Sequence, residues 1–451
     1  MNIFKSICFS QRKNTNFNKY FCNSKSPILH SLKNLSDEDV IQLVKDKKIS
    51  QHKLESELKY SVQRKNKPDC VRAVRIRRKW FNEQGNVEIN VPYKDFNYND
   101  FYNSILGKNC ENVVGYIPIP VGIIGPLHIN KEKYIIPMAT TEGALVASTN
   151  RGCKALNLSG GVNSYVLDDK MTRAPLIKFN NTKQAINFKK WIENEYNFNN
   201  IKRIFESTSN YANLISINLK IVGKNVFMKF NSKTGDAMGM NMVSKGVNKS
   251  LSYIKSIFSD IELTTISGNL CIDKKPSSIN IIEGRGKYVI SECELSKKIL
   301  KNILKVDYEK LIELNYKKNY LGSALAGTVG GNNAHASNIV SSIFLATGQD
   351  IAQNIESSAC FTLFEPSFNN DNIHISVTMP CLEVGTIGGG TSLFSQNQAL
   401  KMLNINGNDE TGNDSEKLAK IISASVLAGE LSLLSALSTN ELVSAHLNLN
   451  R

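Results

Sequence analysis

Of the residues in this sequence, Lys274 has the context that most directly suggests a catalytic role. It lies between Asp273 and Lys275, in a loop bounded by Pro276. In a site that excludes water, a lysine ammonium can stabilise an oxyanion that develops in a transition state, and one such donor contributes about 3 kcal/mol. Adjacent lysines in a loop are nevertheless usually solvated. The pattern alone therefore leaves both interpretations open.

Three further residues could transfer protons. Glu142 follows Thr140 and Thr141 at the start of a predicted helix, where the helix dipole favours the carboxylate. Asp350, in the phrase ATGQD, could satisfy buried amides, and His446 lies close to the chain end, where segments are often disordered. An acid catalyst would need a raised pKa, which a second carboxylate can produce. Each residue taken alone thus fits a structural role as well as a catalytic one.

The chain between Pro175 and Ile266 alternates between strand and helix patterns. Apolar stretches predict strands at 176–179, 215–222, 226–230 and 261–266, and helical stretches cover 183–205 and about 239–258. The order βαββαβ is that of a ferredoxin-like module, which we expect to be inserted in a larger domain. Nearer the N-terminus, Ser36 followed by Asp39 predicts a helix start, and the basic run at 71–80 predicts a solvated face.

The segment after Gly331 predicts one long, largely buried helix. Residues 332–364 contain no Pro and a single Gly, Gly348. At about 100° per residue, one stripe of this helix carries His335, Asn338, Gln349 and Gln353, with Asp350 beside it. Polar side chains on an otherwise apolar helix must be hydrogen-bonded or wet.

The glycine-rich segments do not support a conventional dinucleotide fold. No G-x-G-x-x-G phrase follows a strand and opens a helix. The clusters GTVGG (327–331) and GTIGGGT (385–391) lack the distal acid of that fold and, taken alone, indicate tight backbone turns.

Six phrases carry a more specific signal. In chain order they are ENVVGYIPIPVGIIGPL (111–127), TTEGALVASTNRGCKA (140–155), DAMGMNMVSKG (236–246), SGNLCIDKKPSSIN (267–280), NAHASNIVSSIFLATGQDIAQN (333–354) and LEVGTIGGGTSL (382–393). Together they resemble the 3-hydroxy-3-methylglutaryl-coenzyme A (HMG-CoA) reductase family, from about residue 111 to the C-terminus. The long ferredoxin-like insert, the DAMGMN phrase and the DKK loop resemble its eukaryote-like class.

The resemblance implies an activity and a fold. The activity is the four-electron reduction of HMG-CoA to mevalonate and CoA by two NADPH, in isoprenoid and sterol precursor biosynthesis. The fold is α+β or α/β, with a large catalytic domain around a long central helix (111–174 and 266–451), an inserted ferredoxin-like NADP(H) domain (175–265) and a helical N-terminal segment (37–110). The family's active site lies between subunits, so we expect a homodimer or homotetramer. No metal is expected.

The resemblance also implies catalytic roles. It makes Lys274 the cation that polarises the reacting carbonyl, and it places Glu142 and Asp350 in one buried cluster with that lysine. His446 would protonate the departing CoA thiolate. His335 and Asn338 would support the substrate rather than transfer protons.

Ligand contacts follow from the same resemblance. The expected contacts are Arg173, Ser267, Asp273, Lys275 and Asn338 for the HMG portion, Asn150 and Arg151 for CoA, and Ser209, Asn210, Tyr211, Asp236, Met238, Met240 and Asn241 for the nicotinamide cofactor. Two residues depart from the family pattern. Asn210 stands where the animal enzymes have an Arg near the 2′-phosphate, so a preference for NADPH over NADH must rest on other residues. His52 stands where some relatives have a Tyr that closes over CoA.

The composition of the 451-residue chain allows two or three domains. A net charge of +15, mostly from Lys spread along the chain, favours a solvated basic surface over nucleic-acid binding, since no nucleic-acid motif accompanies it. The apolar stretch at 116–127 contains three prolines and is shorter than the about 20 residues of a membrane helix, so we expect no transmembrane segment. Nine cysteines without a C-x-x-C pair favour a reducing compartment.

The first 36 residues have the composition of a mitochondrial transit peptide. They contain six Lys or Arg, several Ser and Asn, and no acid before Asp37. We therefore expect a mitochondrial matrix protein. The alternatives are a disordered basic tail and a cytoplasmic location.

Three other functions remain open. The first is an NADH-linked degradative HMG-CoA reductase, which assays with each cofactor in both directions would distinguish. The second is an acyl-CoA-binding protein without turnover, against which the presence of Glu142, Lys274, Asp350 and His446 argues. The third is a nucleic-acid binder, which a salt titration of binding to random duplex DNA would expose.

Overall fold

The computed structural model describes residues 35–51, 54–62, 65–68, 70–85 and 88–89, Leu32, Ile105 and 108–110, and then residues 115–368, 372–407 and 411–439. The predicted leader up to residue 31, His52 and His446 lie outside the described residues. The chain forms two compact units, Met1–Trp80 and Phe81–Arg451.

The first unit contains α1 (Asp37–Lys45), α2 (Leu54–Glu57), the hairpin β1 (Lys59–Val62) and β2 (Lys65–Pro68), and the start of α3 (Cys70–Gly85). The Ser36 hydroxyl accepts the Asp39 N–H, and the Asp39 carboxylate accepts the Ser36 N–H. This capping box confirms the predicted helix start.

The basic run at 71–80 is part of helix α3 rather than a uniformly solvated face. Ala73 and Ile76 are buried. Arg72 and Arg75 both bind the Asp37 carboxylate, at 3.1 and 2.7 Å. Because Arg72 and Arg75 are paired with Asp37, the neighbouring side chains of Ala73 and Ile76 can pack into the small core of this unit.

The ferredoxin-like module has the predicted order. Its elements are β6 (Leu176–Lys178), α6 (Thr182–Glu193), α7 (Glu195–Glu206), β7 (Asn213–Val222), β8 (Asn225–Lys233), α8 (Met240–Ile257) and β9 (Glu262–Thr265). The predicted helix at 183–205 is two helices, because the Asn194 side chain accepts the N–H groups of Tyr196 and Asn197 and starts a new helix. The strands pair antiparallel in the order β7-β8-β6-β9.

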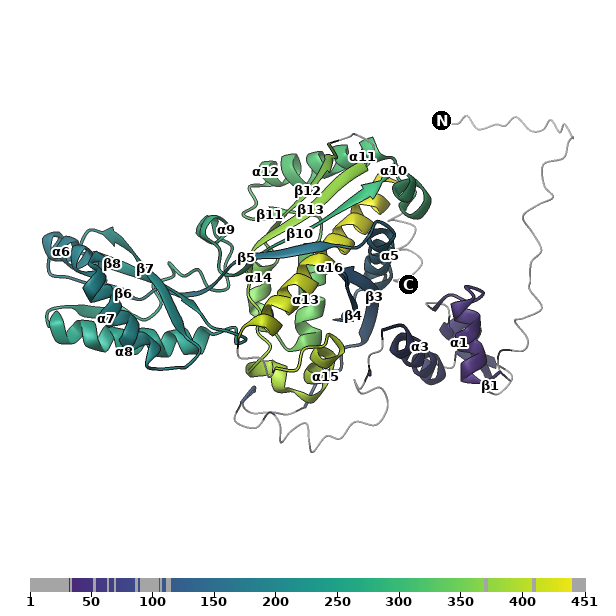
Figure 1. The fold of residues 1–451 in the computed structure, drawn as a ribbon, viewed down its shortest axis with the longest axis horizontal. Coiled ribbons are helices and arrows are strands. Elements are labelled where there is room, and N and C mark those ends of the chain that lie inside the picture. Colours follow the sequence, from purple (N-terminus) through teal and green to yellow (C-terminus); the bar gives the residue numbers. More distant parts are fainter. Residues whose placement is uncertain are drawn as a thin grey trace, which may run out of the picture. The chain divides into compact units, whose positions relative to one another are not determined.

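Strand β5 (Asn163–Arg173) connects this module to the large domain (Figure 1). Its first part pairs with β10 (Gly286–Ser296), and its last three residues pair with β8. Beyond β10 the sheet continues through β13 (Asn372–Leu382), β12 (Cys360–Pro366) and β11 (Gly331–Asn332), which gives nine strands in all. Backbone hydrogen bonds, and not only linkers, therefore join the two domains.

The long central helix is α16 (Asn413–Ser438), which spans 26 residues and is buried along most of its length. It packs against α5 (Leu145–Leu158), α13 (Ala336–Thr347) and β10. Within the described part of the chain, α16 is the one helix long and apolar enough to cross a membrane, but 83% of its most apolar window is buried inside the protein. A core helix has this pattern.

The predicted single helix at 332–364 is wrong. α13 ends at Gly348, and η6 (Ile351–Gln353), α14 (Asn354–Ser357) and β12 follow it. Gly348 has φ +72°, and a Cβ there would lie 2.3 Å from the Gly390 carbonyl oxygen. The break divides the predicted polar stripe, since Asn338 lies on α13 whereas Gln349 and Gln353 lie beyond it.

The remaining elements surround this core. They are the hairpin β3 (Val121–Ile129) and β4 (Glu132–Ala139), α9 (Ser278–Glu283), α10 (Lys297–Ile299), η4 (Leu300–Leu304), α11 (Tyr308–Leu314), η5 (Asn315–Gly322), α12 (Ser323–Ala326), η7 (Gly389–Ser392) and α15 (Phe394–Met402). Helices α5 and α16 lie very close together at Gly152, where a Cβ would lie 1.9 Å from the Ala428 carbonyl oxygen.

Candidate active site

The loop that carries Lys274 connects β9 to α9. Lys274 Nζ lies 2.8 Å from Asp350 Oδ2, and the two side chains are 41% and 36% exposed. The pair is therefore partly exposed at the surface of this chain, whereas the cluster was expected to be buried. The hydrogen bond to Asp350 raises the pKa of Lys274, although burial opposes the rise. The lysine is thus held as an ammonium, the form that can polarise a carbonyl.

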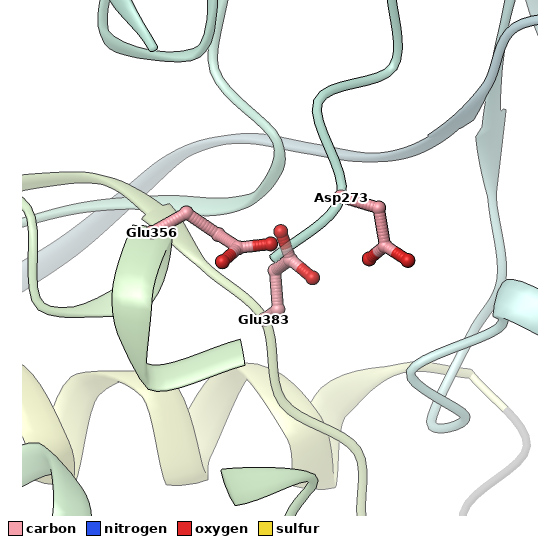
Figure 2. A group of neighbouring side chains, drawn as sticks. All are labelled: Asp273, Glu356 and Glu383. Carbon is pink, nitrogen blue, oxygen red and sulfur yellow. The ribbon is translucent and has the colours of Figure 1, made fainter. Parts of the chain in front are cut away.

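Arg285 is fully buried behind this loop and binds three carboxyl groups. Its Nη1 donates to Glu356 Oε1 at 3.0 Å and also to Glu383, and its Nη2 donates to Asp273 Oδ1 at 3.0 Å. Its Nε donates to Thr172 Oγ1 at 3.0 Å. Figure 2 shows the three carboxyl groups converging from α14, from the end of β13 and from the Lys274 loop.

The charges of this cluster are unbalanced. Burial raises the pKa of Glu383 well above its usual range, and burial likewise raises the pKa of Glu356, while the Arg285 charge opposes both shifts. One guanidinium cannot neutralise three carboxylates, and two adjacent buried carboxylates cannot both ionise readily. The Glu356–Glu383 pair therefore binds a proton more readily than an exposed carboxyl group does.

The same carboxyl groups are close enough to hold a metal ion, because their ligand atoms lie within 4.8 Å of one another. Arg285 already supplies positive charge and donates to all three groups. Charge and hydrogen-bond geometry thus describe an ion-pair network centred on arginine.

Helix α8 presents an open N-terminus. Gly239 precedes it with φ +94° and has no side chain that could cap the first N–H groups of the helix. Uncapped N–H groups at a helix N-terminus suit a phosphate or diphosphate. Met240 opens the helix, and Asn241 follows with an exposed side chain. The phrase DAMGMNMVSKG (236–246), which carries the expected cofactor contacts and is called the cofactor phrase below, therefore forms a structure that fits a dinucleotide.

The glycine cluster at 385–391 packs against this phrase. The Thr386 N–H donates to the Asp236 carbonyl at 2.7 Å, and a Cβ at Gly385 would lie 2.4 Å from Met238 N. Gly388 and Gly389 have φ +83° and +57°. The interpretation as tight backbone turns is confirmed, and the turns lie beside the expected cofactor site.

Two methionines connect the cofactor phrase to the Lys274 loop. Arg285 Nη2 lies 2.9 Å from Met240 Sδ. Gln353 Nε2 lies 3.6 Å from Met238 Sδ and 3.4 Å from Asp273 Oδ1. The charged lysine and the open helix N-terminus thus belong to one continuous network.

A cavity of about 520 Å³ lies farther along the ferredoxin-like module. Ser209, Asn210 and Tyr211 line it, as do residues at the start of α16. Among the described residues that line the cavity, Lys233 is the one cation. Three of the expected cofactor contacts are therefore placed together.

Asp236 is buried and has a structural role in this chain. Its carboxylate accepts the N–H groups of Ser415 at 2.7 Å and of Gly412 at 3.3 Å, at the start of α16. Burial raises the pKa of Asp236, and the hydrogen bonds from Ser415 oppose the rise. Asp236 therefore fixes the cofactor phrase to the central helix.

Glu142 lies apart from the Lys274–Asp350 pair. It is exposed, three residues before Leu145, which starts α5, and its N–H donates to Thr140 Oγ1 at 3.0 Å. With Asn338 it lines a cleft of about 230 Å³. Within the described part of a single chain, no contact joins Glu142 to either residue of the pair. The structure thus brings together two members of the expected three.

The other expected HMG contacts lie near the Lys274 loop. The Gly268 N–H donates to the Ala174 carbonyl at 2.6 Å, which places Ser267 next to the end of β5, where Arg173 lies. Arg173 Nε donates to Ser244 Oγ of α8 at 3.0 Å. Lys275 is exposed, and its Nζ donates to the Asp273 carbonyl at 3.0 Å.

Asn150 and Arg151, the expected CoA contacts, form hydrogen bonds to other residues of this chain. Asn150 Oδ1 accepts the Gly125 N–H at 2.8 Å. Arg151 donates from Nε to Ser432 Oγ and from Nη2 to the Ser432 carbonyl, at 3.1 and 2.8 Å. In this chain both side chains fasten α5 to its neighbours.

Sequence reasoning missed the buried cluster behind the lysine. Arg285 and Glu356 have no place in the predicted site, and Glu383 appears only inside a quoted phrase. The available signal is weak, because charged residues are seldom buried unless paired and the local sequence does not mark these three as buried.

The fold and these contacts define an α/β enzyme in which a nucleotide-binding module is joined to a loop with a charged lysine. Residues 73–451 match the family model of hydroxymethylglutaryl-coenzyme A reductase. The chain belongs to this family and is an oxidoreductase, and the predicted fold class is confirmed.

Relatives from plants and a slime mould are similar over nearly the whole chain. A 3-hydroxy-3-methylglutaryl coenzyme A reductase 1 of Cannabis sativa is 48% identical over 94% of this chain and 72% of its own length. The reductase of Catharanthus roseus is 49% identical, over 94% and 69%. A reductase 1 of Dictyostelium discoideum is 46% identical, over 95% and 75%.

A solved structure shares the fold. The class II 3-hydroxy-3-methylglutaryl-CoA reductase of Streptococcus pneumoniae, bound to NADPH in open conformations, superimposes with a TM-score of 0.59. It covers 90% of this chain and 98% of its own, at 16% identity.

Proposed function

We propose that this chain reduces HMG-CoA to mevalonate and CoA with two NADPH, in the biosynthesis of isoprenoid and sterol precursors. One observation carries the proposal. Lys274, charged and paired with Asp350, lies on a loop whose network contacts Met238 and Met240 of the cofactor phrase. NADPH, when bound, supplies the hydrides.

Lys274 acts on the reacting oxygen in both halves of the reaction. Hydride addition to the thioester gives a tetrahedral oxyanion, and its collapse breaks the C–S bond and leaves an aldehyde and CoA thiolate. A second addition gives an alkoxide, which takes a proton and becomes the alcohol. The ammonium stabilises the negative oxygen in each addition because Asp350 keeps it protonated.

Two other residues are assigned to proton transfer. Glu142 protonates the alkoxide, and His446 protonates the CoA thiolate. The conjugate acid of a thiolate has a pKa of about 8.5, and an imidazolium has a pKa of about 6.5. Proton transfer from the imidazolium to the sulfur is therefore favourable. A protonated thiol no longer attacks the aldehyde.

We also propose that the active site forms between two copies of the chain. Glu142 is exposed beside a cleft, and within one chain it does not contact Lys274. Ile117, which is 88% exposed, lies two positions before a residue that lines the same cleft. A homodimer or homotetramer would cover such a surface and bring the partner subunit's Glu142 to Lys274.

Subunit mixing tests this arrangement. Lys274→Ala and Glu142→Ala proteins are each expected to be nearly inactive. In a mixed dimer, one of the two sites would combine an unchanged Lys274 with an unchanged Glu142, so mixing should restore activity. If both residues serve the site from the same chain, no mixture regains activity.

The residues present fit the dinucleotide. The open start of α8 suits its diphosphate, and the cavity lined by Ser209, Asn210 and Tyr211 suits its adenosine portion. Lys233 lines the same cavity, and its positive charge supports the proposal that a 2′-phosphate binds there. kcat/KM should therefore be higher with NADPH than with NADH, and the opposite order would support the degradative alternative.

The location of the protein is proposed from its first 36 residues alone. Their basic, acid-free composition supports import into mitochondria. A fluorescent fusion of the full chain should locate to mitochondria, and removal of residues 1–36 should leave catalysis intact. A fusion found at the endoplasmic reticulum or throughout the cytoplasm would contradict this proposal.

A further inference from the structure

The backbone at Lys274 is strained. Its φ is +59°, in the left-handed region that residues with a Cβ rarely adopt, and Ile272 and Asn269 nearby have φ +41° and +62°. This conformation is unfavourable for a residue with a Cβ and persists only where surrounding contacts hold it. The conformation of the catalytic loop therefore depends on its anchors.

Glu356 is the anchor at Lys274 itself. Its Oε1 accepts the Lys274 backbone N–H at 2.7 Å, and the same oxygen accepts Arg285 Nη1 at 3.0 Å. Glu356 is 1% exposed. A buried carboxylate with these two donors binds the amide more strongly than a neutral acceptor would.

Arg285 gives this anchor a rigid support. The guanidinium also binds Thr172 of β5 and Glu383, which follows β13. The two strands belong to the same sheet, on either side of β10. The Lys274 backbone is thereby connected to the sheet through two side chains, Glu356 and Arg285.

We propose that Glu356 is a positioning residue for the reaction, which holds the left-handed backbone of Lys274 and so aims the ammonium at Asp350 and the substrate carbonyl. The inference rests on the proposed function, because Glu356 acts through Lys274 and does not touch the substrate. Of the site residues expected from the sequence, none performs this task.

Two substitutions separate the hydrogen bond from the charge. In Glu356→Gln the side-chain oxygen can still accept from Lys274 and Arg285, and the amide N–H can donate to Glu383. Glu356→Ala removes every one of these contacts. We expect kcat to fall by about 100-fold in Glu356→Ala and by less than about threefold in Glu356→Gln, since a displacement of about 1 Å can have an effect of this size. The KM for NADPH should stay within about twofold in both.

A double-mutant cycle distinguishes positioning from general destabilisation. In a Lys274→Ala background, Glu356→Ala should lower kcat no further, because its effect passes through Lys274. Asn315→Ala is a control, since Asn315 is also a buried side chain that holds backbone groups: it accepts the Phe364 N–H at 3.1 Å and donates to the Thr362 carbonyl at 2.9 Å. This control should lower Tm and leave kcat nearly unchanged.

Limited trypsin digestion reports on the loop without any assay of activity. Lys274–Lys275 is a cleavable bond, whereas Lys275–Pro276 resists trypsin because a proline follows. Release of the loop in Glu356→Ala should accelerate cleavage after Lys274 by at least about tenfold, as local opening becomes easier, and Glu356→Gln should not.

Unchanged kcat and unchanged cleavage in Glu356→Ala would overturn the inference, and so would an equal loss of kcat in the two lysine backgrounds. Faster cleavage in a protein that never oxidises NADPH with HMG-CoA would instead overturn the proposed function and retain the anchor.

Discussion

Lys274 Nζ lies 2.8 Å from Asp350 Oδ2, and the Lys274 backbone N–H lies 2.7 Å from a second acid, Glu356. The two acids act on different parts of the lysine. Asp350 raises the pKa of the ammonium, and Glu356 holds the strained backbone. The charge and the direction of the side chain are therefore controlled separately.

The first prediction concerns Lys274→Ala. Because the ammonium matters most when negative charge develops on the substrate oxygen, kcat should fall by at least about 100-fold, or about 3 kcal/mol, while NADPH binding stays near normal. Lys275→Ala is the matched comparison and should mainly raise the KM for HMG-CoA. Steady-state kinetics and NADPH fluorescence titration measure both effects. Turnover of Lys274→Ala within about threefold of the unchanged protein, about 0.7 kcal/mol, would show that the loop is misassigned.

The second prediction concerns His446, which lies outside the described residues. His446→Gln should cripple reduction of HMG-CoA, because the CoA thiolate then lacks its proton donor. Reduction of free mevaldehyde releases no thiolate and should be largely spared. Equal loss in both assays would indicate a structural role, and full activity in both would show that this segment does not reach the site.

The third prediction is a pH dependence of stability caused by Glu383. Because burial raises the pKa of Glu383, the folded protein binds this proton more tightly than the unfolded chain does. The stabilisation is complete below the ordinary pKa of 4.5 and is lost as the pH rises toward the folded-state value. Glu383→Gln lacks this group, so its free energy of unfolding relative to the unchanged protein should increase as the pH rises above 4.5. Urea unfolding measures the difference, and a difference that falls with pH would contradict the assignment.

The fourth prediction tests the packing of the central helix. Gly152→Ala should destabilise the protein by several kcal/mol, on the order of 3, because the added Cβ would overlap the Ala428 carbonyl and force α5 from α16. Gly322→Ala is the control, since its Cβ would meet nothing closer than 3.5 Å, and it should be neutral or slightly stabilising. Thermal unfolding compares the two variants. Equal Tm values would show that the helices can separate at no cost.

Local patterns predicted the ferredoxin-like module and the helix start at Ser36 because each depends on neighbours in the sequence. The alternation of strands and helices between Pro175 and Ile266 reproduces the observed order, and the Ser36–Asp39 capping box lies within one turn. Such patterns could not predict that β5 pairs with strands of both domains, because strand pairing depends on contacts between residues that are distant in the sequence.

The prediction of a long helix after Gly331 failed for a physical reason. Gly348 lies in a pattern that is otherwise helical, and what ends α13 there is the close approach of the Gly390 backbone. The buried helix α16 was overlooked because it is buried on almost every face, and its buried positions include polar residues such as Ser423 and Glu430, so its sequence shows only a weak helical periodicity. In the site, Lys274 and Asp350 were identified through whole phrases, whereas Arg285 and Glu356 become meaningful only when three distant segments meet.

The most direct test of the account follows NADPH oxidation by the purified chain with HMG-CoA as substrate, with CoA thiol and mevalonate measured in the same reaction. The account predicts two NADPH oxidised for each CoA released and each mevalonate formed. Binding of HMG-CoA without any oxidation of NADPH, or oxidation that yields no mevalonate, would contradict it.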